Sequence, residues 1–154
     1  MWPHAVMVFG CYLVTLSIFP GFLAEDVSSE RLGGWYPVLL FTAFNAADLV
    51  GKMLPLVAPV THVRALGGLC GGRVVFVPLF VLVAFGPPRM REEPMVFLLT
   101  VHLGFTNGYL TGNCFEAAPQ CCPRHLQESA GMIMVLSLVG GLAAGAACGF
   151  LWLL

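Results

Sequence analysis

The sequence has few charged residues and no excess of either sign. Charged side chains make up 10% of its 154 residues, against about 25% in an ordinary soluble domain. The 7 Lys and Arg and 8 Asp and Glu give a net charge of −1, which leaves no basic surface for nucleic acid. No Gly-rich phosphate loop follows a strand pattern, and no Cys/His spacing is typical of a zinc site. These absences exclude a nucleic-acid-binding protein and an ordinary soluble domain.

Catalytic groupings are missing as well. No nucleophile with a base, no pair of carboxylates and no set of metal ligands stands out in the sequence. We therefore expect no enzymatic activity, no metal and no cofactor. Most of the 6 cysteines lie in or beside apolar stretches, where a thiol behaves as a small hydrophobic side chain. Cys121 and Cys122 are interpreted either as palmitate acceptors or as ordinary loop residues.

Hydrophobic residues, by contrast, are abundant. They make up 58% of the chain, and its mean hydropathy is +0.88. They gather in five runs, separated by short linkers, at residues 4–23, 35–58, 66–86, 95–115 and 129–153. Each run approaches the ~20 residues with which a helix crosses a hydrocarbon core, and the absence of polar alternation favours helices over strands. The sequence predicts an all-α polytopic membrane protein, with five transmembrane helices in a single bundle over residues 1–154.

Charge alone does not orient these helices. Counted by side, the linkers and their flanks carry three Lys/Arg on one side and four on the other, a difference too small for the positive-inside rule. The first run also has the length of a secretory leader, although it lacks a basic start. A transmembrane helix and a cleaved leader both stay open for this run.

The second run contains two ionisable side chains one helical turn apart, Asp48 and Lys52. On a helix, Asn45, Asp48 and Lys52 project from one face, and Gly51 leaves room beside it. An Asp at the centre of a membrane helix costs about 2.5–3.5 kcal/mol to insert, of which a neighbouring Lys recovers only ~0.2–0.5 kcal/mol. We interpret this face either as the wall of a cavity or as a structural ion pair whose lysine reaches the headgroups.

The fourth run carries a polar stripe. One face of a 3.6-residue helix would hold His102, Thr106, Tyr109, Asn113 and Glu116. The Asn107-Gly108 step adds a flexible polar position within the same run. An aqueous cavity and hydrogen bonds between helices both explain such a stripe in a membrane, and both explanations stay open.

The third run contains an arginine and a proline, and the fifth contains regularly spaced glycines. Arg73 lies about 10 Å into the third run at 1.5 Å per residue, and an antiparallel second run would bring it to Asp48. We predict a structural or gating ion pair between these two side chains. Pro78 is expected to kink the third run. The fifth run repeats a spacing typical of close helix packing, at Gly141, Gly145 and Gly149.

Five motifs occur in order along the chain. They are Leu16-Ser17-Ile18-Phe19-Pro20, Phe44-Asn45-x-x-Asp48-x-x-Gly51-Lys52, Arg73-Val74-Val75-Phe76-Val77-Pro78-Leu79-Phe80, Asn107-Gly108-Tyr109-Leu110 and Glu128-x-Ala130-Gly131. In this order and spacing they resemble the last five spans of the equilibrative nucleoside transporters. The resemblance extends over essentially the whole chain, and five ordered motifs are more specific than any one of them.

The resemblance implies a fold similar to that of the major-facilitator transporters. In that fold, six N-terminal and five C-terminal helices enclose a central site for nucleosides or nucleobases. A cytosolic N-terminus and an extracytosolic C-terminus are also implied. By similarity, Asp48 and Lys52 would lie in the central cavity and hydrogen bond the ribose. With them we group Asn45, Asn107 and Tyr109 as substrate-binding residues.

Lys52 departs from the family pattern, because most nucleoside carriers have Arg at that position. Together with Arg73-Val74-Val75-Phe76, it is more similar to the plasma-membrane monoamine transporter branch, whose substrates include organic cations. Lysine lacks the two-pronged donor with which arginine grips paired hydroxyls. A nucleoside carrier and an organic-cation carrier therefore both stay open.

The six N-terminal spans of the family are absent from this sequence. Because alternating access needs two bundles around a shared site, we expect that the chain does not transport alone. It would need a six-helix partner half or self-association, and the alternative is a truncated, non-transporting membrane protein with an interaction or regulatory role. We expect it in the lipid bilayer of the plasma membrane or of an intracellular membrane.

Overall fold

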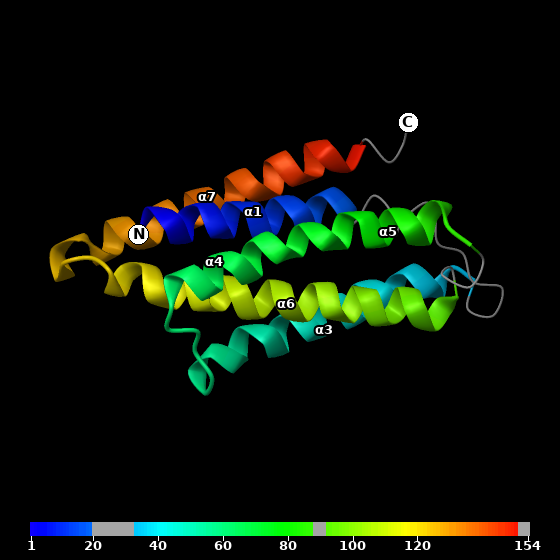
Figure 1. Ribbon diagram of the computed structural model, residues 1–154, viewed down its shortest axis with the longest axis horizontal. Coiled ribbons are helices and arrows are strands. Elements are labelled where there is room, and N and C mark those ends of the chain that lie inside the picture. The colour runs from blue at the N-terminus through cyan, green and yellow to red at the C-terminus, as the bar shows by residue number, and fades with distance from the viewer. Residues whose placement is uncertain (20–32, 88–91, 151–154) are drawn as a thin grey trace.

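The computed structural model describes residues 1–19, 33–87 and 92–150. Their helices run roughly along one axis and form an elongated bundle (Figure 1). The α-helices are α1 (Trp2–Ile18), α3 (Trp35–Met53), α4 (Val63–Gly72), α5 (Phe76–Phe85), α6 (Glu93–Gln120) and α7 (Gln127–Gly149). Short 3-10 turns adjoin them at η1 (Leu54–Leu56), η2 (Arg73–Val75) and η4 (Arg124–Leu126). The described ranges contain no strand, and the prediction of an all-α protein is confirmed.

The helices alternate in direction along the bundle. α1, the α4–α5 stretch and α7 run one way, and α3 and α6 run the other way (Figure 1). The start of α1 and the end of α7 consequently lie at opposite ends of the bundle. Their placement on opposite sides of a membrane stays a prediction.

Three helical stretches are long and apolar enough to cross a membrane. They are Trp35–Leu56, Val63–Phe85 and Arg124–Gly149, and they correspond to the second, third and fifth predicted runs. α1 is apolar but has only 17 residues, and residues 20–23 of the first run lie outside the described ranges. α6 is a continuous helix of 28 residues, but it is not one of these three apolar stretches. For α1 and α6, membrane crossing stays a prediction.

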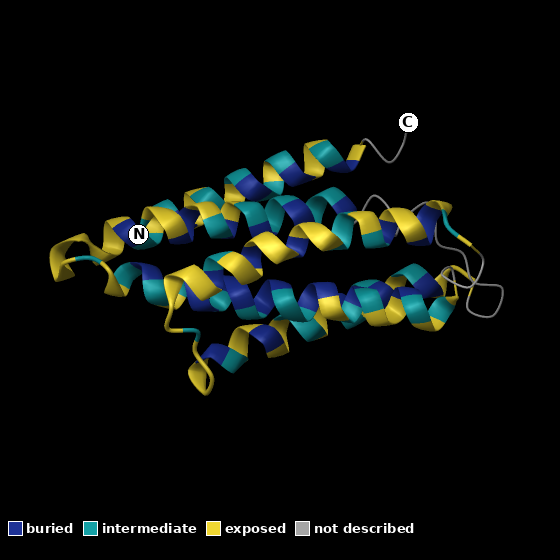
Figure 2. Cartoon of the chain, in the orientation of Figure 1, coloured by how far each residue is buried: buried dark blue, intermediate teal, exposed yellow. Residues whose placement is uncertain are grey.

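The outer faces of the helices are exposed and apolar. Figure 2 shows exposed positions along the outward side of each helix, with buried ones turned inward. Many of them are large hydrophobic side chains, such as Val50 at 57%, Leu136 at 70% and Phe85 at 77% exposure. A soluble protein rarely exposes so much apolar surface, whereas lipid covers it without cost. With helices of membrane-crossing length, these faces make the chain an integral, multi-pass membrane protein.

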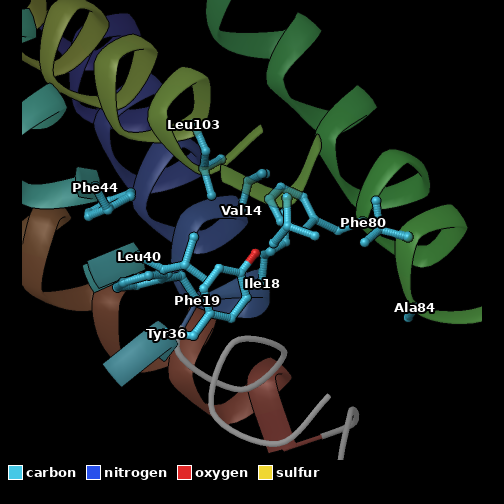
Figure 3. Close-up of a cluster of buried hydrophobic side chains, with 11 residues drawn as sticks. Val14, Ile18, Phe19, Tyr36, Leu40, Phe44, Phe80, Ala84 and Leu103 are labelled. Atoms are coloured by element: carbon cyan, nitrogen blue, oxygen red, sulfur yellow. The ribbon is translucent and has the colours of Figure 1, made fainter. Parts of the chain in front are cut away.

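Two clusters of buried side chains hold the bundle together. The first joins α1, α3, α5 and α6 through residues such as Ile18, Leu40 and Phe80 (Figure 3). The second joins α1, α4, α6 and α7 and includes Cys11. Thr15, which is buried, lies between Cys11 and Ile18 along α1. A polar side chain is thereby positioned between the two apolar clusters.

Glycines bring α7 into close contact with α1. The predicted packing face of Gly141, Gly145 and Gly149 lies against α1. A Cβ atom at Gly145 would be 2.7 Å from Leu16 Cβ and 2.8 Å from the Leu13 carbonyl oxygen. A side chain has no space at this position, because the two backbones are nearly in contact.

A second glycine contact, which the sequence analysis did not single out, joins α3 to α6. Gly104, Gly108 and Gly112 recur at every fourth residue of α6 and face α3. A Cβ at Gly108 would overlap the Asp48 carbonyl group, and Gly51 on α3 is equally close to the α6 backbone. The four-residue spacing of these glycines is itself typical of close helix packing. The polar residues of the predicted stripe are interleaved with them in the sequence and lie on the opposite face of α6.

The α4–α5 stretch changes helix type near its middle. α4 passes into the 3-10 turn at Arg73–Val75 and continues as α5 from Phe76. Pro78 lacks the N–H that would bond the carbonyl of Val74, and Val74 lies within the turn. The irregularity therefore precedes the proline at which the sequence predicted it, and it coincides with the buried Arg73.

Candidate functional site

Asp48 and Lys52 form an ion pair along α3. Lys52 Nζ donates to Asp48 Oδ2 at 2.5 Å. The Lys52 side chain is 44% exposed and that of Asp48 13%, so the carboxylate lies on the inner side of the pair. Asn45 stays on the exposed face of α3 and donates its amide to the Phe41 carbonyl at 2.8 Å. The structure therefore brings Asp48 and Lys52 together, whereas Asn45 forms its hydrogen bond within its own helix.

Asn107 reaches the same carboxylate from α6. Its Nδ2 donates to Asp48 Oδ1 at 2.8 Å, and the residue is only 2% exposed. The neighbouring Gly108 permits this contact, because it removes the side chain that would separate the two helices. One oxygen of Asp48 thus bonds to a cation and the other to an amide.

Thr15 extends this contact into α1. Its hydroxyl lies 2.9 Å from Asn107 Oδ1 and 2.8 Å from the Cys11 carbonyl oxygen, and these two acceptors share its proton. Arg73 Nη2 in turn donates to Thr15 Oγ1 at 2.7 Å. The donors therefore follow one direction, from the guanidinium through a hydroxyl and an amide to the carboxylate. This order also fixes the Asn107 amide, whose oxygen accepts and whose nitrogen donates.

Arg73 is buried at the other end of this hydrogen-bond chain, with 2% exposure. Its Nη1 donates to Thr106 Oγ1 at 3.2 Å, and its guanidinium carbon lies 5.9 Å from the centre of the Phe76 ring. Its Nε has no hydrogen-bond partner among the residues that the structure describes. Thr15 and Asn107 thus bridge Arg73 to Asp48 in this conformation, and a direct ion pair between the two stays a prediction.

The charges in this network are unequal. Lys52 is paired directly with Asp48, whereas the protein groups that contact Arg73 are two hydroxyls and a ring. Two cations therefore share one carboxylate. Burying an ion costs several kcal/mol, and hydrogen bonds and a cation–π contact offset only part of that cost. Among the residues that the structure describes, the interior of the bundle therefore keeps one excess positive charge, on Arg73.

Tyr109 and Asn113 hold the linker between α3 and α4. The Tyr109 hydroxyl donates to the Ala58 carbonyl at 2.8 Å. Asn113 Oδ1 accepts from the Val60 amide at 2.6 Å, while its Nδ2 bonds to the carbonyl of Tyr109. In this conformation, part of the predicted polar stripe of α6 is therefore engaged in hydrogen bonds between segments.

A groove of about 500 Å³ lies between the α4–α5 stretch and α6. Its polar lining residues are Arg73, His102, Thr106 and Tyr109, and the rest of its wall is glycine and apolar side chains. His102 is exposed, with its ring centre 6.3 Å from that of Phe76. The groove is therefore lined by Arg73, at one end of the hydrogen-bond chain, and by three of the five residues of the predicted stripe.

Thr15 is the functional candidate that the sequence analysis missed. It is one threonine in an apolar run, so no periodicity distinguishes it, although the first motif begins at the next residue. Within the described residues, no group of three or more His, Cys, Asp or Glu is arranged to hold a metal ion. The chemistry of the site is therefore that of hydrogen bonds and fixed charges.

Comparison with known proteins identifies relatives of this bundle. The family described as "Nucleoside transporter" matches residues 1–154. Equilibrative nucleotide transporter 1 of Arabidopsis thaliana is 43% identical over 151 residues, which cover 98% of this chain and 34% of the relative. Equilibrative nucleotide transporter 8 of the same plant is 42% identical over 153 residues, 99% of this chain and 39% of that protein.

A third relative agrees with these two. Equilibrative nucleotide transporter 2 of Arabidopsis thaliana is 40% identical over 152 residues, 97% of this chain and 35% of its own length. The chain thus spans little more than a third of the relatives that it matches. These relatives are transporters and not enzymes. Because the family match extends over every residue, as the ordered motifs predicted, the chain belongs to the nucleoside transporter family.

Proposed function

We propose that this chain forms the C-terminal half of an equilibrative carrier that moves nucleosides across a membrane by alternating access. The observation that carries the proposal is the Asp48 carboxylate, which Lys52 and Asn107 hold in one orientation. Each carboxylate oxygen can accept more than one hydrogen bond, and 13% of the side chain is exposed. A carboxylate positioned in advance by two donors can accept sugar hydroxyls with little loss of entropy.

The other predicted residues have different roles in this proposal. Lys52 is partly exposed and would donate to a sugar hydroxyl, and Asn45 would offer its amide from the same face of α3. Asn107 would hold the Asp48 carboxylate in position from α6. Tyr109 would contribute its ring to the wall of the cavity, since its hydroxyl is bound to Ala58.

The charge of the network argues against an organic cation as substrate. Such a substrate would approach two cations and one carboxylate, and the repulsion is strong where water is scarce. A neutral nucleoside meets no such barrier. The names of the relatives specify nucleotides, so a labelled nucleoside monophosphate belongs in the same experiment.

Transport would require the rest of a carrier. The chain spans little more than a third of its relatives, and alternating access needs a second bundle across the site. We propose a six-helix N-terminal bundle as the partner, with self-association as the other way to cover the polar wall. The plasma membrane is the proposed location.

The test is uptake of labelled nucleoside by cells that express this chain with the N-terminal half of a related carrier. We expect saturable uptake, and we expect Asp48→Asn to abolish it while the exposed linker variant Glu92→Gln retains it. Labelled nucleoside monophosphate and labelled organic cation form the other two arms. Uptake that Asp48→Asn leaves intact, or a preference for the cation, would contradict the proposal.

A further inference from the structure

The groove between α4–α5 and α6 has the surface of a site for an amphiphile. Apart from the polar residues already named, its lining includes Leu69, Leu79, Leu99 and Leu110. Its rim is exposed, with Leu69 at 51% and Val75 at 57%. An exposed apolar rim of this kind is suited to contact with lipid. A molecule with a hydrocarbon chain can therefore enter the groove from the bilayer.

Arg73 gives this apolar groove a positive end. It is preceded by ten residues and followed by twelve in the stretch Val63–Phe85, which places it about 15–18 Å from either end at 1.5 Å per residue. Its side chain is turned inward to Thr15 and is 2% exposed. It consequently cannot extend to the headgroups as peripheral arginines do.

The donor capacity of Arg73 is not exhausted by the protein. Its two terminal nitrogens donate to Thr15 and Thr106, but Nε, although buried, has no partner within residues 1–19, 33–87 and 92–150. The nearest carboxylate along its hydrogen bonds is Asp48, which Lys52 already neutralises. A buried donor on an uncompensated cation favours an anionic acceptor.

We propose that this groove binds a single-chain organic anion of the fatty carboxylate class. The carboxylate lies at the Arg73 end of the groove, where a shift of the buried guanidinium lets Nε donate to it, and the hydrocarbon tail lies between α4–α5 and α6. The charge complements the excess cation, and the apolar lining complements the tail. A phospholipid phosphate fits less well, because Arg73 lies about 15 Å from the headgroup level. The groove shares Tyr109 with the proposed substrate cavity, but binding in the groove can be measured without transport.

Three glycines of α4 provide a matched test. Gly68 and Gly72 line the groove, and a Cβ at either would meet nothing within 4 Å. Gly71 is equally free of contacts but does not line it. Gly72→Leu should therefore enter the groove with no clash at its Cβ, and Gly71→Leu is the same change one residue earlier on α4, outside the groove lining.

The experiment is photolabelling of the full chain, in nanodiscs of phosphatidylcholine, with a diazirine derivative of palmitate. We expect label in peptides containing Leu69, Leu79 or Leu99. Gly72→Leu should lower it about tenfold, and Arg73→Gln by a similar factor, because a charge-assisted hydrogen bond is lost. Gly71→Leu should label as the wild type does. Unlabelled palmitate should compete, and hexadecanol should not.

Several outcomes would overturn the proposal. Equal competition by hexadecanol would mean that the groove accepts any alkyl chain without selecting an anion. Displacement by phosphatidylglycerol as effective as that by palmitate would identify a phospholipid headgroup as the occupant. Equal labelling of Gly72→Leu and Gly71→Leu would place the label outside the groove, and this comparison decides the matter even where Arg73→Gln folds poorly.

Discussion

The α3–α6 and α1–α7 contacts use the same packing device for different ends. In both, glycines spaced four residues apart on one helix lie against the backbone of the other. Beside Gly108, however, Asn107 reaches across to Asp48, whereas Gly145 faces the apolar Leu13 and Leu16. In each contact the glycines bring the two backbones together. Beside Gly108 the adjacent Asn107 adds a hydrogen bond between the helices, whereas the side chains that face Gly145 are apolar.

Removing the carboxylate should disturb the α3–α6 contact most. In Asp48→Ala, Lys52 loses its ion pair and Arg73 loses the anion at the end of its hydrogen-bond chain. We expect the free energy of unfolding to fall by about 3 kcal/mol or more, measured by unfolding in SDS micelles. Asp48→Ala combined with Arg73→Met should recover much of this loss. A double variant no more stable than Asp48→Ala would show that the two charges are not coupled.

Adding one methyl group at the centre of the same contact should have the next largest effect. A Cβ at Gly108 would overlap the Asp48 carbonyl group and lie 2.9 Å from the Lys52 amide nitrogen. We expect Gly108→Ala to lower the free energy of unfolding by about 2–3 kcal/mol. Gly131→Ala, where a Cβ meets nothing within 4 Å, is the control and should be neutral or slightly stabilising. Equal stability of the two variants would contradict the close contact.

The corresponding change in the α1–α7 contact sharpens the comparison. Gly145→Ala places a Cβ against Leu16 and two carbonyl oxygens, and we expect a loss of about 1–2 kcal/mol. The loss is smaller because α7 packs chiefly on α1 and can tilt away. In the assembled carrier, the affinity for nucleoside should stay unchanged. A reduced affinity would mean that α7 also shapes the site.

The smallest effect is expected at Thr15, which links α1 to Arg73 and to Asn107 of α6. Thr15→Val keeps the shape of the side chain but removes the hydroxyl between Arg73 and Asn107. We expect a loss of about 0.6 kcal/mol, the average for hydrogen bonds between membrane helices, and no more than ~1.7 kcal/mol, the largest value measured. Thr15→Ser retains the hydroxyl and should restore the hydrogen-bonded part of the stability. Equal losses in Thr15→Val and Thr15→Ser would assign the effect to packing.

The helices were largely predictable from the sequence, because the bilayer imposes a length on each apolar run. The predicted second run, 35–58, and the observed Trp35–Leu56 differ by two residues. Membership of the family was predictable too, since ordered motifs are read directly from the chain. The polar stripe of α6 marked the right helix, although Tyr109 and Asn113 bind a linker in this conformation.

The hydrogen-bond partners were not predictable in the same way. Periodicity gives the face of a helix on which a residue lies, but not the residue that faces it. Asn107 and Thr15 are 92 positions apart, and only the crossing of α1 and α6 brings them together. For Arg73, the sequence offered Asp48 as a direct partner, and the packing of α1 places Thr15 between them.

The glycine contact between α3 and α6 also has a consequence for motion. Gly104, Gly108 and Gly112 form a row of notches, each four residues, or about 6 Å, from the next. At Gly104 and Gly108 the nearest atoms of α3 are the backbone carbonyl oxygens of Phe44 and Asp48, so a small sliding movement would press side-chain Cβ atoms against carbonyl groups. α3 and α6 are therefore expected to move together as one rigid unit, or to shift along each other by a full helical turn. Asp48 and Asn107 travel together in the first case and part completely in the second.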